Sequence, residues 1–459
     1  MSEALACFKA NDIRGTFPHP LSSDLAYALG TVLAKHCAVK KALIAQDIRL
    51  SGPKLRSAIA LGLHENGCQV SFLGLSGTEE VYYAATHGDY DCGIMITGSH
   101  NPAEENGFKL VRRGAIPISS ESGLFSIRDH VDRLLQTLKA PSADFPYAEP
   151  AKDDSYLHWL LQSSGIEHAK IHARPFKVLA CAGNGCAGPL LARLAPFLPF
   201  ELIIQYGEPD GTFPHGVPNP LLPERRKDTQ EAVLAAHADL GVAFDGDFDR
   251  CFFFDAKGQF IEGYYLVGLL AHEILRTHPG AKIVHDPRLY WHTQEIVRKA
   301  HGIPILCRAG HAMIKACMRR EDAVYGGEMS AHHYFRDFNY CDCGMLPFLL
   351  VSRLLLQSSQ TLEEMVAQAM ARYPCSGEIN RRVSDPQRVL THLRSLYAAH
   401  SLHEDHLDGL SLTFSSWRFN VRMSNTEPLL RLNVESRGDR ALVEDKTQEI
   451  LTQIDRYAE

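Results

Sequence analysis

The 459-residue sequence has no long apolar segment. Among its longest apolar runs is Met345 to Val351, well short of the about 18 residues of a membrane-spanning helix. No basic stretch followed by an apolar core opens the chain, so we expect no signal peptide and a cytoplasmic protein. The 12 cysteines lack regular spacing, which indicates reduced thiols instead of a disulfide framework.

The chain also has no large excess of positive or negative charge. The chain has 47 Lys and Arg against 54 Asp and Glu, a net charge of -7. This mild acidity is untypical of a general nucleic-acid binder, although a local basic pocket can still hold a small anion. Hydrophobic residues at 45% and charged residues at 22% exclude a disordered or fibrous protein. The length predicts about three domains.

A pair of predicted elements, a strand with a helix, and a later strand that ends in a turn recur three times in this order along the chain. Apolar runs that end in Gly-containing turns lie at 94–96, 242–244 and 323–325. Each of these runs is preceded by another apolar run and then by a helical pattern. The earlier apolar runs begin at Lys41, Lys177 and Lys282. Alternation of strands and helices indicates parallel strands covered on both faces. Chance similarity of short apolar segments is the alternative.

The last part of the chain differs, because its predicted strands cluster at 411–414, 418–421 and 430–434 between two helical patterns. Such segregation is typical of an α+β domain. We therefore expect an α/β protein with three related mixed-sheet α/β domains and a C-terminal α+β domain around a central cleft. The expected domains are 1–146, 147–252, 253–370 and 371–459.

Polar loops follow the three repeated strands, where ligands of open parallel sheets bind. The first is Thr97-Gly98-Ser99-His100-Asn101-Pro102. Gly98 permits a positive φ, so we expect Ser99 at an exposed tip. A serine hydroxyl is a good nucleophile only when a neighbour takes its proton, and His100 and Lys109 are the candidate bases. An ordinary turn is the alternative.

The second loop places carboxylates at alternate positions, Asp245, Asp247 and Asp249. A hard cation would relieve their repulsion, and oxygen ligands favour Mg²⁺ or Ca²⁺ over zinc. An EF-hand does not fit, because Arg250 and Ala256 stand where it needs Gly and Glu. A solvated acidic turn is the alternative.

The third loop, 326–333, offers Glu328, Ser330 and His332, which can hydrogen-bond adjacent sugar hydroxyls. The alternatives for His332 and His333 are a zinc site or packing in the core.

The fourth loop, 422–428, contains Arg422, Ser424, Asn425 and Thr426. With Arg431 just downstream, this set suits a dianionic phosphate, and a plain hairpin turn is the alternative.

Further basic residues extend this list of candidates. Arg14 lies in a turn near the start, and Arg288, Arg308 and His311 follow predicted strands. Arg14 alone would more often be a surface charge. We interpret the thiols of Cys341-Asp342-Cys343 as structural. A serine, a cation site, a hydroxyl-binding loop and a phosphate loop together match phosphoryl transfer to or from a sugar phosphate.

These four loops, in this order and over nearly the whole chain, resemble the signature loops of the α-D-phosphohexomutase family. The opening segment 8–15 is similar too. Runs 76–80, 210–214 and 325–337 most resemble the bacterial phosphomannomutase branch of that family. Asn11 and Met423 depart from the family pattern, which puts affinity in doubt but removes no group that the chemistry needs.

The resemblance implies that a phosphoserine at Ser99 gives its phosphoryl group to a hexose monophosphate, forming a 1,6-bisphosphate, and then takes back the other phosphate. The expected reaction interconverts mannose 6-phosphate and mannose 1-phosphate for GDP-mannose synthesis. A phosphoglucomutase or a dual-specificity enzyme is the alternative. A hexose 1,6-bisphosphate would act as activator.

The resemblance also implies roles for the candidate residues. Mg²⁺ would be held by Asp245, Asp247, Asp249 and a phosphoryl oxygen on Ser99. His100 and Lys109 would transfer protons, while Arg14 and Arg250 would stabilise charge. Expected substrate contacts come from Arg250, Arg288, Arg308, His311, Glu328, Ser330, His332, Arg422, Ser424, Asn425, Thr426 and Arg431. We expect a small-molecule hexose phosphate as the partner, no nucleic acid, no membrane, and a monomer or homodimer.

Two rival functions remain at this point. A Mg²⁺ phosphatase with an aspartyl nucleophile could use Asp245 and Asp247, but Asp249 stands where that class usually has Thr or Val, and Ser99 would have no role. A non-catalytic sugar-phosphate sensor would tolerate Ser99→Ala.

Overall fold

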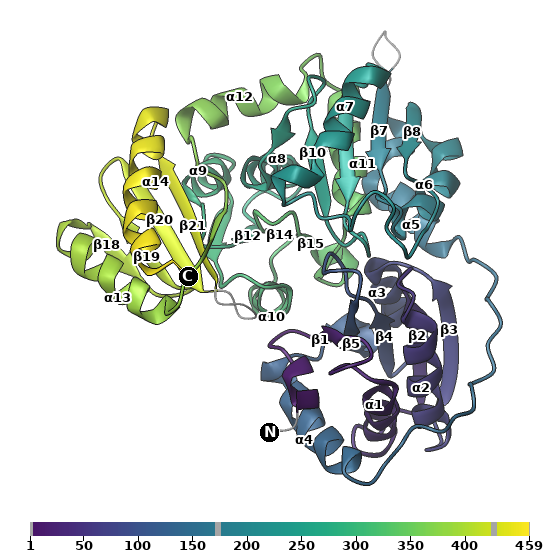
Figure 1. Cartoon of the computed structure of the whole chain (residues 1–459). Coiled ribbons are helices and arrows are strands. Elements are labelled where there is room, and N and C mark those ends of the chain that lie inside the picture. The colour runs from purple at the N-terminus through teal and green to yellow at the C-terminus, as the bar shows by residue number, and fades with distance from the viewer. Residues whose placement is uncertain (1–2, 170–175, 424–428, 459) are drawn as a thin grey trace. The chain divides into compact units, whose positions relative to one another are not determined.

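The computed structural model describes residues 3–169, 176–423 and 429–458, and the chain divides into two compact units. The first unit comprises residues 1–260 and 341–359. The second comprises residues 261–340 and 360–459. Figure 1 labels their helices and strands.

The first sheet of the first unit is mixed, with strand order β1-β5-β4-β2-β3 and β6 beside β5. β2 pairs parallel with β3 and β4, whereas β5 runs antiparallel to both β4 and β1. The strands are β1 (Ile13–Thr16), β2 (Lys41–Gln46), β3 (Gln69–Leu75), β4 (Cys92–Ile96), β5 (Glu105–Arg112) and β6 (Ile116–Pro117). The helices are α1 (Ser23–Lys35), α2 (Gly52–His64), α3 (Thr78–His87) and α4 (Leu124–Leu135).

The second sheet repeats this plan, with strand order β11-β10-β9-β7-β8. β7 pairs parallel with β8 and β9, and β10 returns antiparallel to β9. The strands are β7 (Lys177–Cys181), β8 (Glu201–Gln205), β9 (Leu240–Phe244), β10 (Cys251–Phe254) and β11 (Phe260–Ile261), where the unit ends. The helices are α5 (Ser155–Ser164), α6 (Ala187–Leu194) and α7 (Lys227–Ala236).

A later segment completes the first unit. It holds the short strand β16 (Cys341–Asp342) and the helix α11 (Met345–Leu356), which is almost entirely apolar. The Phe348 ring of α11 lies edge-on to the rings of Phe200 and Phe244. The predicted third domain, 253–370, therefore includes residues that belong to the first compact unit.

The third sheet, in the second unit, has the order β13-β12-β14-β15. β12 pairs parallel with β13 and β14, and β15 runs antiparallel to β14. The strands are β12 (Lys282–His285), β13 (Ile303–Leu306), β14 (Tyr325–Gly327) and β15 (His333–Phe335). The helices are α8 (Gly263–Thr277), α9 (Trp291–Lys299), α10 (His311–Glu321) and α12 (Leu362–Arg372).

The fourth sheet is antiparallel, with strand order β17-β21-β20-β19-β18. Its core consists of aliphatic and aromatic side chains, among them Leu412, Phe419 and Leu432. The strands are β17 (Ile379–Arg382), β18 (His403–Asp405), β19 (Leu410–Thr413), β20 (Trp417–Met423) and β21 (Leu429–Ser436). The helices are α13 (Pro386–Tyr397) and α14 (Arg440–Ile454).

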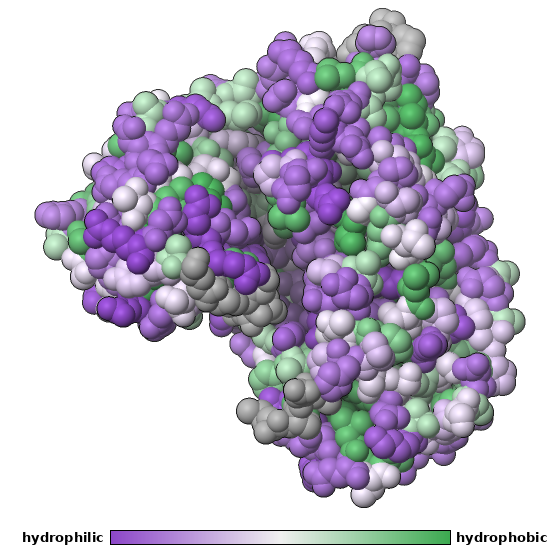
Figure 2. All heavy atoms as spheres, in the orientation of Figure 1, coloured by the Kyte–Doolittle hydropathy of each residue, from purple (hydrophilic) through white to green (hydrophobic). Residues whose placement is uncertain are grey.

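The expected fold class, three mixed-sheet α/β domains and a C-terminal α+β domain, is confirmed. The boundaries near 146, 252 and 370 stay predictions. Within the described ranges, no helix has the length and apolar character needed to cross a membrane. Figure 2 shows apolar residues in small groups among hydrophilic ones on the visible surface.

Candidate active site

The serine loop connects β4 to β5, and its conformation differs from the predicted one. Ser99 itself has the positive φ, 49°, and its side chain is buried, with 2% of the residue exposed. The predicted exposed tip is therefore wrong. Glycine is required at position 98 because the Arg49 side chain lies very close, and not because of a positive φ. A Cβ there would lie 2.5 Å from the Arg49 guanidinium carbon.

Arg49 holds the backbone of the serine loop in this buried position. Its guanidinium lies beneath the serine loop and donates hydrogen bonds to the carbonyl oxygens of Ser99 (2.9 Å) and Asn101 (2.6 Å). Asp47 lies 3.3 Å from Arg49 Nε and accepts a hydrogen bond from the Thr97 hydroxyl at 2.7 Å. Sequence reasoning missed both residues as parts of the site, and their only signal was a position just after the β2 strand.

The Ser99 hydroxyl meets two possible proton acceptors. It donates to Asp245 Oδ2 at 2.9 Å, and His100 Nδ1 lies 3.1 Å away. Arg250 donates to Asp245 Oδ2 from Nη2 at 2.7 Å and also bonds His100 Nδ1. With Arg250 donating, Nδ1 is the acceptor nitrogen of His100 and the ring proton lies on Nε2.

The metal loop lies against the serine loop. A Cβ on Gly246 would be 2.5 Å from the Ser99 carbonyl oxygen, so only glycine allows this approach. Asp245, Asp247 and Asp249 are at most 1% exposed, and one carboxylate oxygen of each lies within 4.8 Å of the others. Oδ1 of Asp247 has no hydrogen-bond partner among the residues described. A buried cluster of oxygen ligands with an unused oxygen fits a hard divalent cation.

Lys109 contacts the same carboxylates. Its Nζ lies 2.6 Å from Asp247 Oδ2 and 2.6 Å from Asp249 Oδ2. Burial alone would lower the pKa of Lys109, but the two carboxylates outweigh burial and raise it above its ordinary value. Burial likewise opposes ionisation of Asp247, yet Lys109 holds the Asp247 pKa below its usual range. Lys109 is thus an ammonium in this arrangement, a donor and not a free base.

Arg14 reaches the serine loop from the N-terminal strand. It pairs with Asp12 at 2.8 Å and donates to the side-chain oxygen of Asn101 at 3.0 Å. Burial opposes the charge, but Asp12 raises the pKa of Arg14 above its ordinary value. Arg14 is therefore a half-buried, fixed cation of the site, and not a free surface charge.

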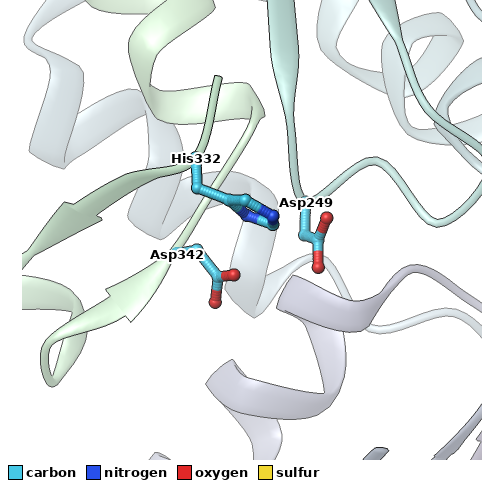
Figure 3. Close-up of side chains that lie close together, drawn as sticks. All are labelled: Asp249, His332 and Asp342. Atoms are coloured by element: carbon cyan, nitrogen blue, oxygen red, sulfur yellow. The ribbon is translucent and has the colours of Figure 1, made fainter. Parts of the chain in front are cut away.

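Another carboxylate, on Asp342, joins this cluster from the distant segment 341–359. Carboxylate oxygens of Asp249 and Asp342 lie within 4.8 Å of each other, and Figure 3 shows both side chains. Asp342 is fully buried. Its neighbours Cys341 and Cys343 are buried free thiols, in agreement with their structural interpretation. Sequence reasoning did not select Asp342, because it lies 93 residues after Asp249 with no linking pattern.

Other candidates gather in the second unit around Arg288, which is 2% exposed. Its Nη2 donates to Asp286 Oδ2 (2.8 Å) and Ser330 Oγ (3.1 Å) and lies 3.5 Å from Glu328 Oε1. Burial opposes the charge, but Asp286 above all raises the pKa of Arg288. Glu328 also accepts a hydrogen bond from Tyr334 at 2.5 Å, so this cation and carboxylate are firmly oriented.

Arg422 and Arg431 lie opposite each other on β20 and β21. Both approach Glu378, at 2.9 Å and 3.4 Å, and Arg288 approaches it at 3.3 Å. Sequence reasoning missed Glu378, since a lone Glu before a strand gives no signal. Ser424, Asn425 and Thr426 lie outside the described residues.

The remaining candidates have varied surroundings. The Arg308 side chain is 53% exposed, and its Nε lies 3.8 Å from Asp408. His311 opens α10, and His332 is half-buried with its ring 6.0 Å from that of Tyr334. His333 is fully buried and bonds the Tyr325 hydroxyl at 2.7 Å, so it packs in the core.

Comparison with known proteins identifies the family of this chain. Phosphoglucomutase/phosphomannomutase family models match the chain in sequence order, with α/β/α domains I, II and III at 6–137, 154–258 and 262–373. The C-terminal domain model matches 378–453. A relative from Xanthomonas campestris named "phosphohexose mutases" is 52% identical over 448 residues, covering 97% of this chain and 98% of its own.

Two further relatives are similar along their whole length. A phosphomannomutase of Escherichia coli K12 is 49% identical over 458 residues, covering 98% of each chain. The crystal structure of a phosphoglucomutase/phosphomannomutase family protein from Burkholderia thailandensis is 29% identical, with a TM-score of 0.83 and 99% of both chains covered. The chain belongs to the phosphoglucomutase/phosphomannomutase family and is a mutase, that is, a phosphotransferase.

Proposed function

We propose that this enzyme is a phosphomannomutase that interconverts mannose 6-phosphate and mannose 1-phosphate and supplies GDP-mannose synthesis. The observation that carries the proposal is the buried Ser99 hydroxyl, 2.9 Å from Asp245 within a cluster of acidic side chains. Relatives named phosphomannomutase at 49–50% identity support the mannose assignment. The 52% identical relative named phosphohexose mutases keeps dual specificity as the alternative.

In the proposed reaction, Ser99 carries a phosphoryl group in the resting enzyme. A sugar hydroxyl attacks the phosphorus, the P–O bond to Ser99 breaks, and the bound hexose 1,6-bisphosphate results. The attacking hydroxyl loses a proton to His100 Nδ1, which lies 3.1 Å from Ser99 Oγ, and His100 gives a proton to the departing Ser99 Oγ, so that the serine leaves as a hydroxyl. Return of the other phosphoryl group to Ser99 reverses these steps at the other end of the sugar. Free hexose 1,6-bisphosphate would act as activator by phosphorylating empty Ser99.

Fixed positive charge surrounds Ser99. Arg250 bonds both Asp245 and His100, and Arg14 donates to the Gly98 carbonyl at 3.3 Å, so both guanidinium groups are held beside the transferring phosphoryl group. Cations at this position stabilise the charge that develops on the phosphoryl oxygens. Lys109 adds an ammonium that can donate a hydrogen bond there.

Asp245, Asp247 and Asp249, with a phosphoryl oxygen on Ser99, would hold Mg²⁺. The ion would neutralise charge on the phosphoryl group during transfer. Three buried carboxylates with an unused Asp247 oxygen support this assignment.

Residues of the second unit would bind the substrate. Glu328 and Ser330, oriented by Arg288, would bind sugar hydroxyls with His332. Arg422 and Arg431, with Ser424, Asn425 and Thr426, would bind the phosphate that does not react. Arg308 and His311 would add contacts. All cysteines described are free, which supports a reducing compartment such as the cytoplasm. We expect a monomer or homodimer.

Phosphopeptide mapping of active enzyme tests the phosphoserine. We expect stable phosphate on Ser99, and Ser99→Ala should remove nearly all turnover while hexose phosphate still binds. Phosphate on an aspartate would favour the phosphatase rival, and full function of Ser99→Ala would favour a sensor. Parallel assays with mannose 1-phosphate and glucose 1-phosphate, each primed with its bisphosphate, decide the substrate. Equal kcat/KM would establish dual specificity.

A further inference from the structure

Glu378 is a carboxylate at the meeting point of three arginines. Its Oε2 accepts hydrogen bonds from Arg422 Nη2 at 2.9 Å and Arg288 Nη1 at 3.3 Å. Its Oε1 accepts a hydrogen bond from Arg431 Nη1 at 3.4 Å. The arginines come from three places in the second unit: the loop after β12, β20 and β21. One side chain therefore fixes where three guanidinium groups point.

The three arginines around Glu378 determine its ionisation. Burial would raise the pKa of Glu378, but Arg422, Arg288 and Arg431 outweigh burial and lower it to about 2. The carboxyl group is therefore ionised at neutral pH, and its negative charge faces all three guanidinium groups. Nε of Arg288 and Nε of Arg422 are buried and have no hydrogen-bond partner among the described residues. Asp286 and Glu328 also contact Arg288, so the group presents unused guanidinium donors among several carboxylates, and these donors suit an anion.

A carboxylate also competes with phosphate, because both bind guanidinium groups in the same bidentate way. Without Glu378, the three arginines would have one negative charge fewer beside them and would bind a dianion more tightly in every step of the reaction. Binding that is equally strong in ground and transition states lowers KM without raising kcat. A mutase must also let its bisphosphate change position between two half-reactions, so overly tight phosphate binding would slow turnover.

We propose that Glu378 is a positioning residue with two effects: it aligns Arg288, Arg422 and Arg431, and its negative charge weakens their hold on the non-reacting phosphate. This inference rests on the proposed function of these arginines as the phosphate site. The ligand class is the dianionic phosphate monoester, and Glu378 sets its rate of release.

Glu378→Gln tests the proposal, because it keeps the side-chain volume and removes the charge. Binding of inorganic phosphate and of mannose 1-phosphate is measured by calorimetry on the full-length, dephosphorylated enzyme. We expect both Kd values to fall about tenfold, since one repulsive charge a few ångströms away is removed. In steady-state assays KM and kcat should both fall. A residue that only supported the fold would instead loosen the arginines and raise Kd.

Glu404→Gln is the matched control. It removes a carboxylate from an exposed pair with Arg394 in the same C-terminal region, and we expect unchanged Kd values. Unchanged or higher Kd in folded Glu378→Gln would overturn the proposal. If Glu378→Gln does not fold, Glu378→Asp decides: its shorter carboxylate should lower Kd by a smaller factor, and a higher Kd would overturn the idea. Wild-type enzyme that neither binds nor converts hexose phosphates would instead refute the proposed function.

Discussion

The Nζ atom of Lys109 lies 2.6 Å from Oδ2 of Asp247 and 2.6 Å from Oδ2 of Asp249. An ammonium group therefore contacts two of the carboxylates that we propose as metal ligands. All three side chains are buried, so solvent screens this attraction little. A divalent cation and the ammonium must compete for the same oxygens.

Replacing Lys109 by Met should therefore strengthen metal binding while it weakens catalysis. We expect the Kd for Mg²⁺ to fall about tenfold, because a competing positive charge is removed, and kcat to fall because a donor beside the phosphoryl group is lost. Calorimetry on the dephosphorylated enzyme measures the Kd. Lys41→Met removes a surface ammonium paired with Asp89 and is the control. Weaker Mg²⁺ binding in Lys109→Met would contradict competition.

Asp247→Ala removes a proposed metal ligand that also accepts hydrogen bonds from Lys109 and Thr78. Turnover should be abolished, and excess Mg²⁺ should not restore it, because the ligand itself is missing. The measurement is kcat over a range of Mg²⁺ concentrations. Asp228→Ala, at an exposed position of the same domain, should stay active. Full recovery of Asp247→Ala at high Mg²⁺ would argue against direct coordination.

Gly98→Ala probes the contact between the serine loop and Arg49. The new Cβ would lie 2.5 Å from the guanidinium carbon, so Arg49 or the loop must move, at a cost of about 1–3 kcal/mol in the free energy of unfolding. Because Ser99 follows directly, we also expect a large loss of Ser99 phosphorylation. Denaturant unfolding and intact mass spectrometry measure the two effects. Gly52→Ala, whose Cβ would meet its nearest atom at 3.5 Å, should change neither.

Local patterns made the loops predictable, whereas their burial depended on distant residues. Ser99, Asp245 and Glu328 each follow a strand that is recognisable from its apolar run, so the sequence indicated these positions and the mixed α/β fold. Arg49, 50 residues before Ser99, holds the backbone of the serine loop in its buried position, and no local signal marks that contact.

The missed residues share one property: each acts through partners far away in the sequence. Asp342 meets Asp249 from a segment that returns to the first unit after 80 residues in the second. Glu378 matters only because Arg288 and Arg422 meet there. Periodicity and spacing describe neighbours along the chain, so they cannot identify such pairs.

Glu79 gives the stability of the first unit a distinct pH dependence. It is fully buried and accepts hydrogen bonds from Tyr156 at 2.6 Å and from the Gly344 N–H at 2.6 Å, which opens the turn into α11. Burial outweighs these bonds and raises the pKa of Glu79 from 4.5 to about 8. The folded protein thus keeps a proton on Glu79 that the unfolded chain releases at lower pH.

The sign of this effect follows from proton binding. Between the unfolded pKa near 4.5 and the folded pKa of about 8, the folded state binds more protons. The free energy of unfolding therefore falls as pH rises through this window, by at most about 1.4 kcal/mol per pH unit, and this contribution is level above it. Glu79→Gln mimics the protonated acid and should remove the fall. Urea unfolding at pH 5 to 8 measures the free energy of unfolding at each pH. Glu121→Gln, at an exposed position, is the control and should leave the pH dependence unchanged. If the free energy of unfolding depends on pH in the same way in the wild type and in Glu79→Gln, the raised pKa of Glu79 is contradicted.

Arg418 and Glu435 form a fully buried pair at 2.9 Å that supports the loop before α9. Arg418 donates to the carbonyl oxygens of Pro287 and Arg288, at 2.9 Å and 2.7 Å, and Glu435 accepts the Tyr290 N–H at 2.9 Å. The backbone on both sides of the Arg288 side chain is thereby held by residues of the fourth sheet. Breaking this pair should cost stability and also disturb Arg288.

Arg418→Met leaves the Glu435 carboxylate buried without a cation, so we expect a loss of about 3–5 kcal/mol in the free energy of unfolding. Adding Glu435→Gln removes the isolated charge and should restore part of the lost stability. A double-mutant cycle based on urea unfolding measures this coupling between the two residues. Arg394→Met breaks the exposed pair with Glu404 and should cost less than about 1 kcal/mol. If the two losses at 418 and 435 simply add, the pair is not coupled. KM for hexose phosphate should rise in the double variant more than kcat falls, because Arg288 loses the support of its backbone while the serine loop is untouched.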